Sequence, residues 1–420
     1  MHDAASRMCG GRLLPAVLVV SVVLLLLAVS GCLRPGGQNV LQSEDRLIRV
    51  RILQDRQEVA LLASAAPVYA TAGDPTLRKL DLPAGRTVSV TLAADGWRVG
   101  STAVGAGVLY LRPSPPGSLA VEGVAYRGQY RLVPVGPERF DVVNDVDVDD
   151  YLKSVVSREL YWNWHIETYK AQAIVARTYA LYEKHVPREP RHWDVHADTR
   201  SQVYGGIAAE TTRSITAVEE TAGVVVAFGP RGEERIFKAY FSSCCGGISQ
   251  SAADAFGDVW MAPLSDQNVH GLCSASDKFN WGPVVIPKSE VTRRIRLFGQ
   301  QRNRPEKDIA AVRSIEIEAV NRWGRPVRFL VTDASGTRFS LRGEELRWAI
   351  NTDAPRGSTL FSSFVKVVND SDRIHFVEGH GHGHGVGMCQ WCAETRARAG
   401  MRHEDIVLAA YPAARLIRAY

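Results

Sequence analysis

Two helical patterns lie next to each other between Asp149 and His185, and the second of them is apolar nearly all round. The first pattern repeats apolar residues at helical spacing, at Leu152, Val155, Val156 and Leu160. A helix that is apolar on every side is buried in a folded protein, so the chain must build a core around this segment.

Glu159 lies within the apolar stripe of the first helix. A carboxylate on the inward face of a helix must be paired, hydrogen-bonded or kept protonated. Lys170 and Arg177 share one face of the second helix. An inward acid and two basic groups beside it indicate either a functional site or a buried salt bridge that holds the two helices together. The residues alone leave both interpretations open.

The N-terminus has the pattern of an export signal. Arg7 and Arg12 precede an apolar run over residues 13–28, and small residues at 29–31 precede Cys32. The run is short for a membrane-spanning helix, which needs about 20 apolar residues. The pattern resembles a bacterial lipoprotein signal, with an ordinary signal peptide or a single anchor helix as alternatives. We expect residues 1–32 to be a lipoprotein signal peptide, Cys32 to carry the lipid and residues 33–45 to be a tether. The mature protein is then a membrane-anchored lipoprotein of the cell envelope, outside the cytoplasm.

The composition permits an acidic polymer as a partner but does not favour nucleic acid. The formal charge of +5 is mild for 420 residues, and no basic run interleaved with aromatic residues is present. Five cysteines lie beyond the signal, at positions 244, 245, 273, 389 and 392. Disulfides can form outside the cytoplasm, and an odd number leaves one thiol unpaired. A bond from Cys244 or Cys245 to one of the other three is the better expectation, because these two are adjacent in the sequence.

Three histidines and two cysteines near the C-terminus are a candidate zinc site. His380, His382 and His384 alternate with glycine, and Cys389 and Cys392 could complete a ligand set. The same histidines would also serve a loop that contacts a ligand through hydrogen bonds, and the two cysteines fall on an expected helix. We therefore expect no bound metal and no cofactor.

The order of the expected elements favours an α+β fold. Short β patterns with turns between them run over residues 46–116 and end in a proline-rich segment, which predicts a small all-β module. Further strands lead into the helix pair, and helices alternate with strands from 286 to 359 in mixed order. We expect mostly antiparallel sheets, with the helix pair forming a substrate groove.

Four motifs, in this order, resemble the stage II sporulation protein D (SpoIID/LytB) domain family. They are EL-(x)3-W-(x)2-E-(x)2-KAQAIVARTYAL, DTRSQVYGG, FSSCCGG and GHGHGVGMCQW. The resemblance predicts a SpoIID/LytB-like domain over residues 117–420. It implies peptidoglycan as the substrate: sporulation members are lytic transglycosylases that cut between N-acetylmuramic acid (MurNAc) and N-acetylglucosamine (GlcNAc) and leave 1,6-anhydro ends. Other members enhance a cell-wall amidase, which implies that amidase as a partner.

The resemblance assigns the family's catalytic glutamate to Glu159. It also implies a set of glycan contacts, at Lys170, Gln172, Arg177, Asp198, Gln202, Tyr204, Ser242, Ser243, His384 and Gln390. Glycoside hydrolysis generally needs two carboxylates, but a lytic transglycosylase can use one, because the sugar's own C6 hydroxyl attacks the anomeric carbon. Such an acid works best with a pKa raised toward neutrality. Lys170 or Arg177 in contact with Glu159 would instead lower that pKa.

The chain departs from the family pattern in two places. The usual Met-Pro after the glutamate reads Leu160-Tyr161, and the proline after the tryptophan reads His165. Some members bind zinc near the Asp-Thr loop, but the matching positions here hold His196, Arg200 and Ser201, so we expect no zinc there. The prediction is a lipid-anchored lytic transglycosylase. A peptidoglycan-binding or amidase-enhancing protein is the alternative, and a zinc-dependent hydrolase built on the His/Cys loop is a third.

Overall fold

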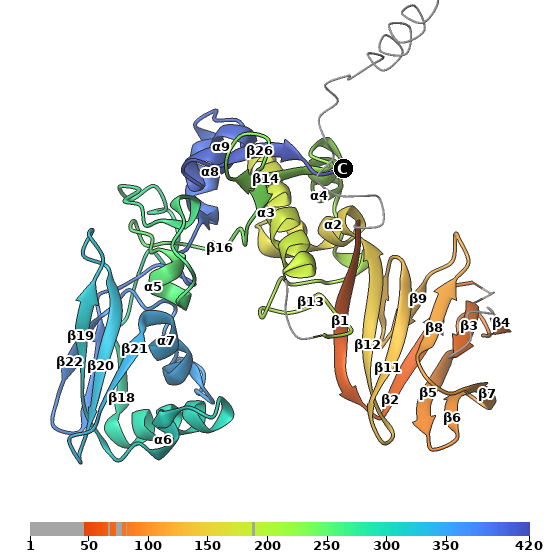
Figure 1. The fold of residues 1–420 in the computed structure, drawn as a ribbon, viewed down its shortest axis with the longest axis horizontal. Coiled ribbons are helices and arrows are strands. Elements are labelled where there is room, and N and C mark those ends of the chain that lie inside the picture. Colours follow the sequence, from red (N-terminus) through yellow and green to blue (C-terminus); the bar gives the residue numbers. More distant parts are fainter. Residues whose placement is uncertain (1–45, 66–67, 73–77, 81, 187–189) are drawn as a thin grey trace, which may run out of the picture. The chain divides into compact units, whose positions relative to one another are not determined.

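The computed structural model describes residues 46–420, apart from 66–67, 73–77, 81 and 187–189 (Figure 1). The expected signal peptide, Cys32 and the tether lie outside the described residues. Within the described part of the chain, no helix has the length and apolar character needed to cross a membrane.

Two sheets lie in the N-terminal half of the described chain (Figure 1). The first sheet has the order β13 (Val195–His196), β1 (Leu47–Arg56), β12 (Arg139–Asp147), β11 (Gln129–Gly136), β8 (Leu109–Pro113), β3 (Val68–Ala72) and β4 (Arg78–Leu80). The second has the order β10 (Val124–Tyr126), β9 (Leu119–Val121), β2 (Glu58–Ala63), β5 (Thr87–Ala93), β6 (Gly96–Val99) and β7 (Thr102–Gly105). Every pair is antiparallel except β1 with β13.

The β module expected over residues 46–116 does not stand apart from the residues that follow it. Strand β1 pairs along its length with β12, and β2 pairs with β9, so both sheets contain strands from each side of residue 116. Apolar and basic residues alternate at the start of β1, where Ile48 and Val50 are buried and Arg49 and Arg51 are only partly buried. This alternation is visible in the sequence, which holds no sign of which strands are partners.

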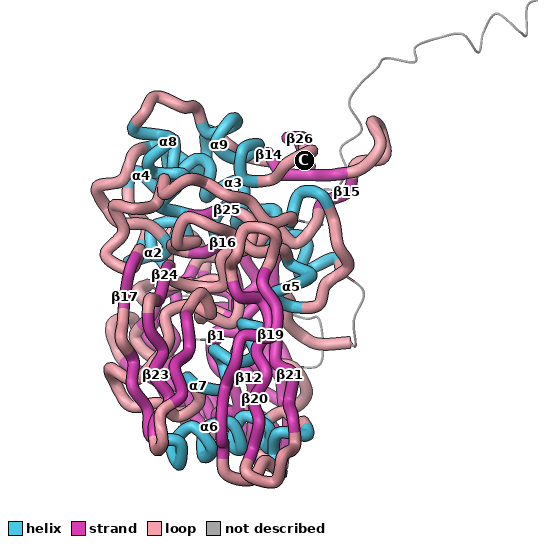
Figure 2. The backbone as a smooth tube through the Cα atoms, turned by 90° about the vertical axis from the view of Figure 1, so that its left-hand side faces the viewer, coloured by secondary structure: helices cyan, strands magenta, loops and turns pink. Residues whose placement is uncertain are grey.

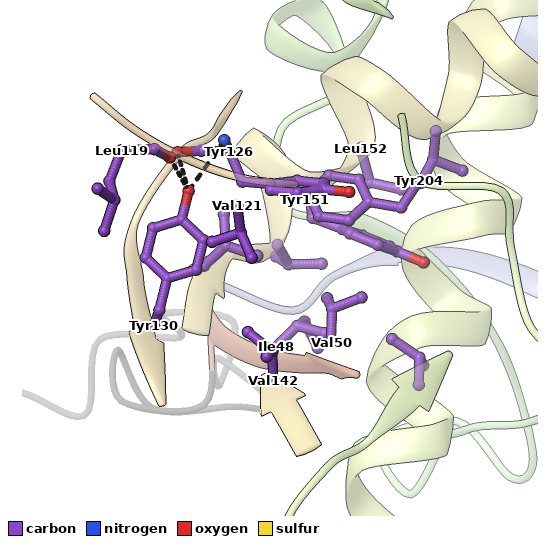
Figure 3. Close-up of a cluster of buried hydrophobic side chains, with 14 of the residues drawn as sticks. Ile48, Val50, Leu119, Val121, Tyr126, Tyr130, Val142, Tyr151, Leu152 and Tyr204 are labelled. Atoms are coloured by element: carbon purple, nitrogen blue, oxygen red, sulfur yellow. Dashed lines mark hydrogen bonds between the residues drawn. The ribbon is translucent and has the colours of Figure 1, made fainter. Parts of the chain in front are cut away.

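Tyr130 of β11 links the two sheets in their shared core (Figure 3). Its hydroxyl donates to the carbonyl of Leu119 in β9, and it accepts a hydrogen bond of 3.1 Å from the N–H of Tyr126 in β10. The ring of Tyr204 packs 4.9 Å from those of both Tyr126 and Tyr151, centroid to centroid. A buried phenol needs such partners, and this one joins β11 to the second sheet. Tyr204 in turn links Tyr126 to Tyr151 of the helix that follows β12.

The helix pair forms where the sequence predicts it. Helix α2 (Val148–Glu159) begins directly after β12, and the Asp147 side chain caps it by accepting from the Asp149 N–H. Helix α3 (Ile166–His185) is buried over most of its length, as its apolar pattern predicts. It packs against α2, α4 (Thr212–Glu220), α8 (Gln390–Arg398), α9 (His403–Ala410) and β14 (Val224–Phe228) (Figures 1 and 2).

The C-terminal half contains small sheets and further helices. The sheets are β15 (Arg235–Ile236) with β14 and β26 (Arg415–Arg418); β16 (Phe241–Ser242) with β25 (Met388–Cys389); β17 (Asn280–Trp281) with β24 (Gly379–His380); β18 (Val284–Pro287) with β23 (Arg373–Val377) and β22 (Lys366–Asn369); and β19 (Val312–Val320) with β20 (Pro326–Asp333) and β21 (Arg338–Arg342). The helices are α5 (Ala252–Phe256), α6 (Lys288–Gln301) and α7 (Gly343–Asn351), with short 3-10 turns at Ile207–Ala209, Ala262–Leu264 and Pro305–Asp308. The α+β class with mostly antiparallel sheets is confirmed.

Candidate functional site

A cleft of about 860 Å³ opens at the C-terminal end of α2. Its walls come from α2, the loop at 199–203, the segment at 238–243, α5, α7 and the His-Gly loop, by which we mean residues 379–385. Five of the residues expected from the sequence line it together: Glu159, Ser242, Ser243, His384 and Gln390. With the loop at 199–203, which belongs to the DTRSQVYGG motif, the fold brings all four sequence motifs to one cleft.

Glu159 is the last residue of α2, and its side chain is partly exposed to the cleft. The backbone N–H of Val203 donates to Oε1 at 3.2 Å, and the side-chain amide of Gln390 donates to Oε2 at 3.5 Å. Burial raises the pKa of Glu159, and these two hydrogen bonds offset only part of the rise. Among the described residues no basic side chain forms an ion pair with it. A carboxyl group with a raised pKa keeps its proton to a higher pH than a free one does, which suits it to giving and taking a proton.

Lys170 and Arg177 contact other acids and do not line the cleft. Lys170 pairs with Glu167 at 3.0 Å and with Glu220 at 2.7 Å. Arg177 is fully buried and pairs with Asp149 at 2.8 Å. The sequence predicted both residues in or near the groove, and their contact with glycan stays a prediction. Their pairing with other acids leaves the pKa of Glu159 free of a basic neighbour on α3.

Four other expected residues also lie outside the cleft lining. Gln172 is buried and accepts from the Gln390 amide at 3.4 Å, so it is one contact away from Glu159. Gln202 accepts from the Tyr151 hydroxyl at 3.1 Å, and Tyr204 donates to Asn144 at 3.0 Å. Asp198 is exposed and pairs at 2.7 Å with Arg200, which does line the cleft. Direct glycan contact by these four residues stays a prediction.

The His-Gly loop lies against the strand that carries Ser242. The Ser242 hydroxyl accepts from the Gly385 N–H at 3.1 Å. Gly383 has a φ of +94°, and a Cβ there would lie 2.9 Å from the Ser242 side chain, so only glycine fits this approach. His384 accepts from the Val386 N–H at 3.0 Å, and burial lowers its pKa to about 4. The imidazole is therefore neutral at pH 7 and serves to shape the cleft wall.

Aromatic residues that the sequence did not single out form one side of the cleft. Tyr240 stacks on Phe256 at 4.7 Å between ring centroids, and Phe256 stacks on Trp348 at 6.2 Å. Asp258 is exposed, and its carboxylate accepts from the Tyr240 hydroxyl at 2.8 Å. No motif marked these residues, because Trp348 lies on α7 and reaches the cleft only through the tertiary fold.

Two groups of side chains in the described chain have the spacing to hold a metal ion. One is Cys245, Cys273, Cys389 and Cys392; the other is Glu167, His403 and Glu404. None of the three histidines of the His-Gly loop joins either group. His380 and His382 instead pack against Phe364 and Phe361, at 4.9 and 5.4 Å between ring centroids. All five cysteines of the described residues are free and buried, so none of the disulfides considered from the sequence is formed.

Comparison with known proteins places the helix pair in a family. Residues 137–228 match the family model described as "Stage II sporulation protein" (SpoIID). These residues are a SpoIID domain. The SpoIID domain contains α2, α3 and Glu159, and it ends before Ser242, His384 and Gln390.

Relatives of the whole chain are distant. It is 27% identical over 291 residues to an uncharacterized protein of Brachyspira hyodysenteriae, covering 68% of this chain and 71% of that protein. It is 24% identical over 296 residues to the amidase enhancer of Bacillus subtilis, covering 62% of this chain but only 39% of the enhancer. An uncharacterized protein of Chlamydia pneumoniae is 29% identical over 180 residues, covering 42% of this chain and 65% of the relative. The SpoIID assignment thus has independent support, whereas most of the enhancer has no counterpart here.

Proposed function

We propose that this chain is a cell-wall protein that binds peptidoglycan glycan strands in the cleft and acts on them as a lytic transglycosylase. It would cut between MurNAc and GlcNAc and leave a 1,6-anhydro end. One observation carries the proposal: the Glu159 carboxyl lines the cleft without an ion pair, and burial raises its pKa. The SpoIID match and the similarity to an amidase enhancer support the link to the cell wall.

Glu159 would serve as both acid and base. Protonated Glu159 donates its proton to the glycosidic oxygen as the bond to the anomeric carbon of MurNAc breaks. The resulting carboxylate then takes the proton of the MurNAc C6 hydroxyl, whose oxygen bonds to the anomeric carbon and closes the anhydro ring. The Val203 N–H and the Gln390 amide stabilise the anion between these steps. No water enters the reaction, so no second carboxylate is needed to activate one.

The cleft has the other features that a glycan site needs. Sugar rings present apolar C–H faces, and the stack of Tyr240, Phe256 and Trp348 offers a matching aromatic surface along one wall. Polar groups of Ser242 and Ser243 line the same cleft. This combination suits a polymer of alternating apolar faces and hydroxyl edges.

The decisive experiment compares three proteins on peptide-free and on peptide-bearing glycan strands, with mass spectrometry of the ends produced. The wild type should yield 1,6-anhydro ends, and Glu159→Gln should lower the rate by about 10²- to 10⁴-fold, the usual contribution of general acid–base catalysis. Asp258→Asn is the matched control, because it removes the exposed carboxylate of the same cleft. Reducing ends in place of anhydro ends, with activity lost in both variants, would indicate a two-carboxylate hydrolase and overturn the proposal.

A second function is favoured by the similarity to the amidase enhancer of Bacillus subtilis. In that case the cleft binds glycan without cutting it, and the protein stimulates a cell-wall amidase. The wild type would then give no new glycan ends. The wild type and Glu159→Gln would bind glycan strands equally, and each would raise the rate of a purified amidase.

We also propose that a lipid on Cys32 anchors the protein at the outer face of a membrane, on the pattern of residues 1–32. Replacing Cys32 by Ser should move the protein from the membrane fraction to the soluble fraction. Equal membrane association of the variant would show that the anchor is of another kind.

A further inference from the structure

Four buried cysteines from separate parts of the chain meet at one point. Cys245 follows β16, Cys273 lies in the loop before β17, Cys389 ends β25 and Cys392 lies in the first turn of α8. Their sulfur atoms all lie within 4.8 Å of one another, and all four side chains are buried. Four buried thiols this close together are the arrangement expected of disulfides or of ligands to a metal ion.

The sulfur separations match a tetrahedral metal site. Zinc bound by four thiolates at about 2.3 Å requires neighbouring sulfurs to lie about 3.8 Å apart, which is the edge of that tetrahedron. The Sγ atom of Cys245 lies 3.6 Å from that of Cys273 and 3.9 Å from that of Cys392. A disulfide would need a separation of about 2.05 Å. The four sulfurs therefore surround a space of the size that one metal ion fills.

Backbone N–H groups are directed at the sulfur of Cys389. It accepts from the Cys245 N–H at 3.3 Å and from the Cys392 N–H at 3.4 Å. Cys389 is the N-cap residue of α8, where free amide groups favour a negative charge. Such hydrogen bonds orient thiolate ligands and stabilise their charge.

A buried cation contacts the backbone of Cys245, one of the four cysteines. Arg325 is fully buried, and its guanidinium donates to the carbonyl of Cys245 at 3.1 Å and to that of Ile248 at 2.7 Å. The nearby acid Glu344 pairs with Arg347 at 2.6 Å, so in the described chain Arg325 has no direct ion pair. An unpaired buried charge is costly. One Zn²⁺ with four thiolates carries a net charge of −2, and this would offset the charge of Arg325.

We propose that Cys245, Cys273, Cys389 and Cys392 bind one Zn²⁺ ion in a closed, structural site. Four protein ligands leave no position for water or substrate, so the ion would stabilise the fold and take no part in chemistry. This set uses two cysteines of the site considered from the sequence but none of its histidines. The proposal does not depend on glycan cleavage.

The location of the ligands gives the ion a positioning role at the cleft. Cys245 follows the cleft residues Ser242 and Ser243, and Cys389 directly precedes Gln390, whose amide contacts Glu159. Strand β16 pairs in parallel with β25, so both segments are already neighbours. The ion would fix their separation and hold Gln390 within reach of the catalytic carboxyl.

The test is metal analysis of the full-length protein purified without added metal. We expect one equivalent of zinc per chain, and thiolate-to-metal charge-transfer bands after exchange with Co²⁺. Cys392→Ser should lose the bound metal. Cys244→Ser is the matched control, because Cys244 is equally buried and adjacent to Cys245 but lies outside the set; it should retain one equivalent.

Three outcomes would overturn the proposal: wild type without zinc and with its cysteines in disulfides, iron in place of zinc, or metal lost from Cys244→Ser but kept by Cys392→Ser. If Cys392→Ser does not fold, wild type treated with a chelator supplies the second measurement. Its Tm should fall and return with one equivalent of Zn²⁺. An unchanged Tm after confirmed removal of zinc would show that the ion does not stabilise the fold.

Discussion

Glu159 titrates in surroundings that favour its neutral form. Burial raises its pKa above the ordinary value of 4.5, so between that value and the raised pKa the folded protein binds a proton that the unfolded chain has released. The protonated carboxyl therefore contributes to the stability of the fold at low pH, and this contribution is lost as the pH rises through the raised pKa. The residue lowers stability at neutral pH, which is common for groups retained for function.

This linkage predicts the stability of Glu159→Gln. The variant should match the wild type at pH 4, where the carboxyl is largely protonated in both states, and should exceed it at pH 7.5, because glutamine carries no charge to bury. Urea unfolding at the two pH values measures the difference. Glu233→Gln, at an exposed turn, should change neither value. A variant less stable than wild type at pH 7.5 would mean that the carboxylate is stabilised in the folded protein.

The sequence identified Glu159 correctly as a partly buried acid but could not identify its neighbours. Spacing along α3 placed Lys170 and Arg177 on one face, yet α3 is surrounded, so residues on one face meet different elements. The partner of Arg177 is on α2, and one partner of Lys170, Glu220, is on α4. Pairings of this kind depend on tertiary packing, which periodicity does not encode.

At the scale of elements, Arg177 joins four segments. From α3 it pairs with Asp149 in the first turn of α2, and it donates to the carbonyls of Val218 on α4 and Val224 on β14. Its guanidinium thus satisfies backbone groups at the end of one helix and the start of one strand. The salt bridge first considered for Glu159 exists in this protein, but it uses a different acid.

Arg177→Met should lower the free energy of unfolding by about 3–5 kcal/mol, because it leaves Asp149 and two carbonyls without their buried partner. Arg177→Lys keeps the charge but cannot reach all three groups, so its loss should be smaller. Lys170→Met, on the same helix but partly exposed, should cost less than about 1 kcal/mol. Urea unfolding measures all three. Wild-type stability of Arg177→Met together with weaker glycan binding would instead support the groove contact expected from the sequence.

Long elements were predictable and short ones were not. The apolar periods of α2 and α3 and the alternation of β1 and β5 are local properties of the sequence. The sequence from Arg235 to Ser243 has the pattern of one strand. The structure has two short strands there, β15 and β16, whose partners β14 and β25 lie on different segments. Two-residue strands form only because a partner is presented to them, so their existence depends on the whole fold.

At the scale of the molecule, the boundary expected near residue 116 runs through both sheets. Strand β1 supplies one neighbour of β12, and β8 supplies one neighbour of β11. Ile48 and Val50 of β1 and Leu132 of β11 are fully buried in the same core. The proline-rich segment connects β8 of the first sheet to β9 of the second. Its composition predicts a loop but does not show which strands pair across it.

A fragment of residues 117–420 should therefore fail to fold by itself. Removal of β1 and β8 would expose apolar side chains of β11 and β12 and leave the hydrogen-bonding edges of those strands unpaired. We expect aggregation or a loss of near-UV circular dichroism, whereas residues 46–420 should fold and resist limited proteolysis. A soluble 117–420 fragment with the Tm of the longer chain would restore the predicted domain boundary.

Strand β26 pairs with β14, so residues 415–418 lie beside residues 224–227. Helices α8 and α9 close over α3 from the same late part of the chain. During synthesis α3 emerges long before these partners, and for that time its apolar surface has no cover. The cleft also takes Gln390 from this region. Assembly of the cleft is therefore a late event in folding, and a chain whose synthesis stops before residue 390 would be an aggregation-prone intermediate with an incomplete cleft.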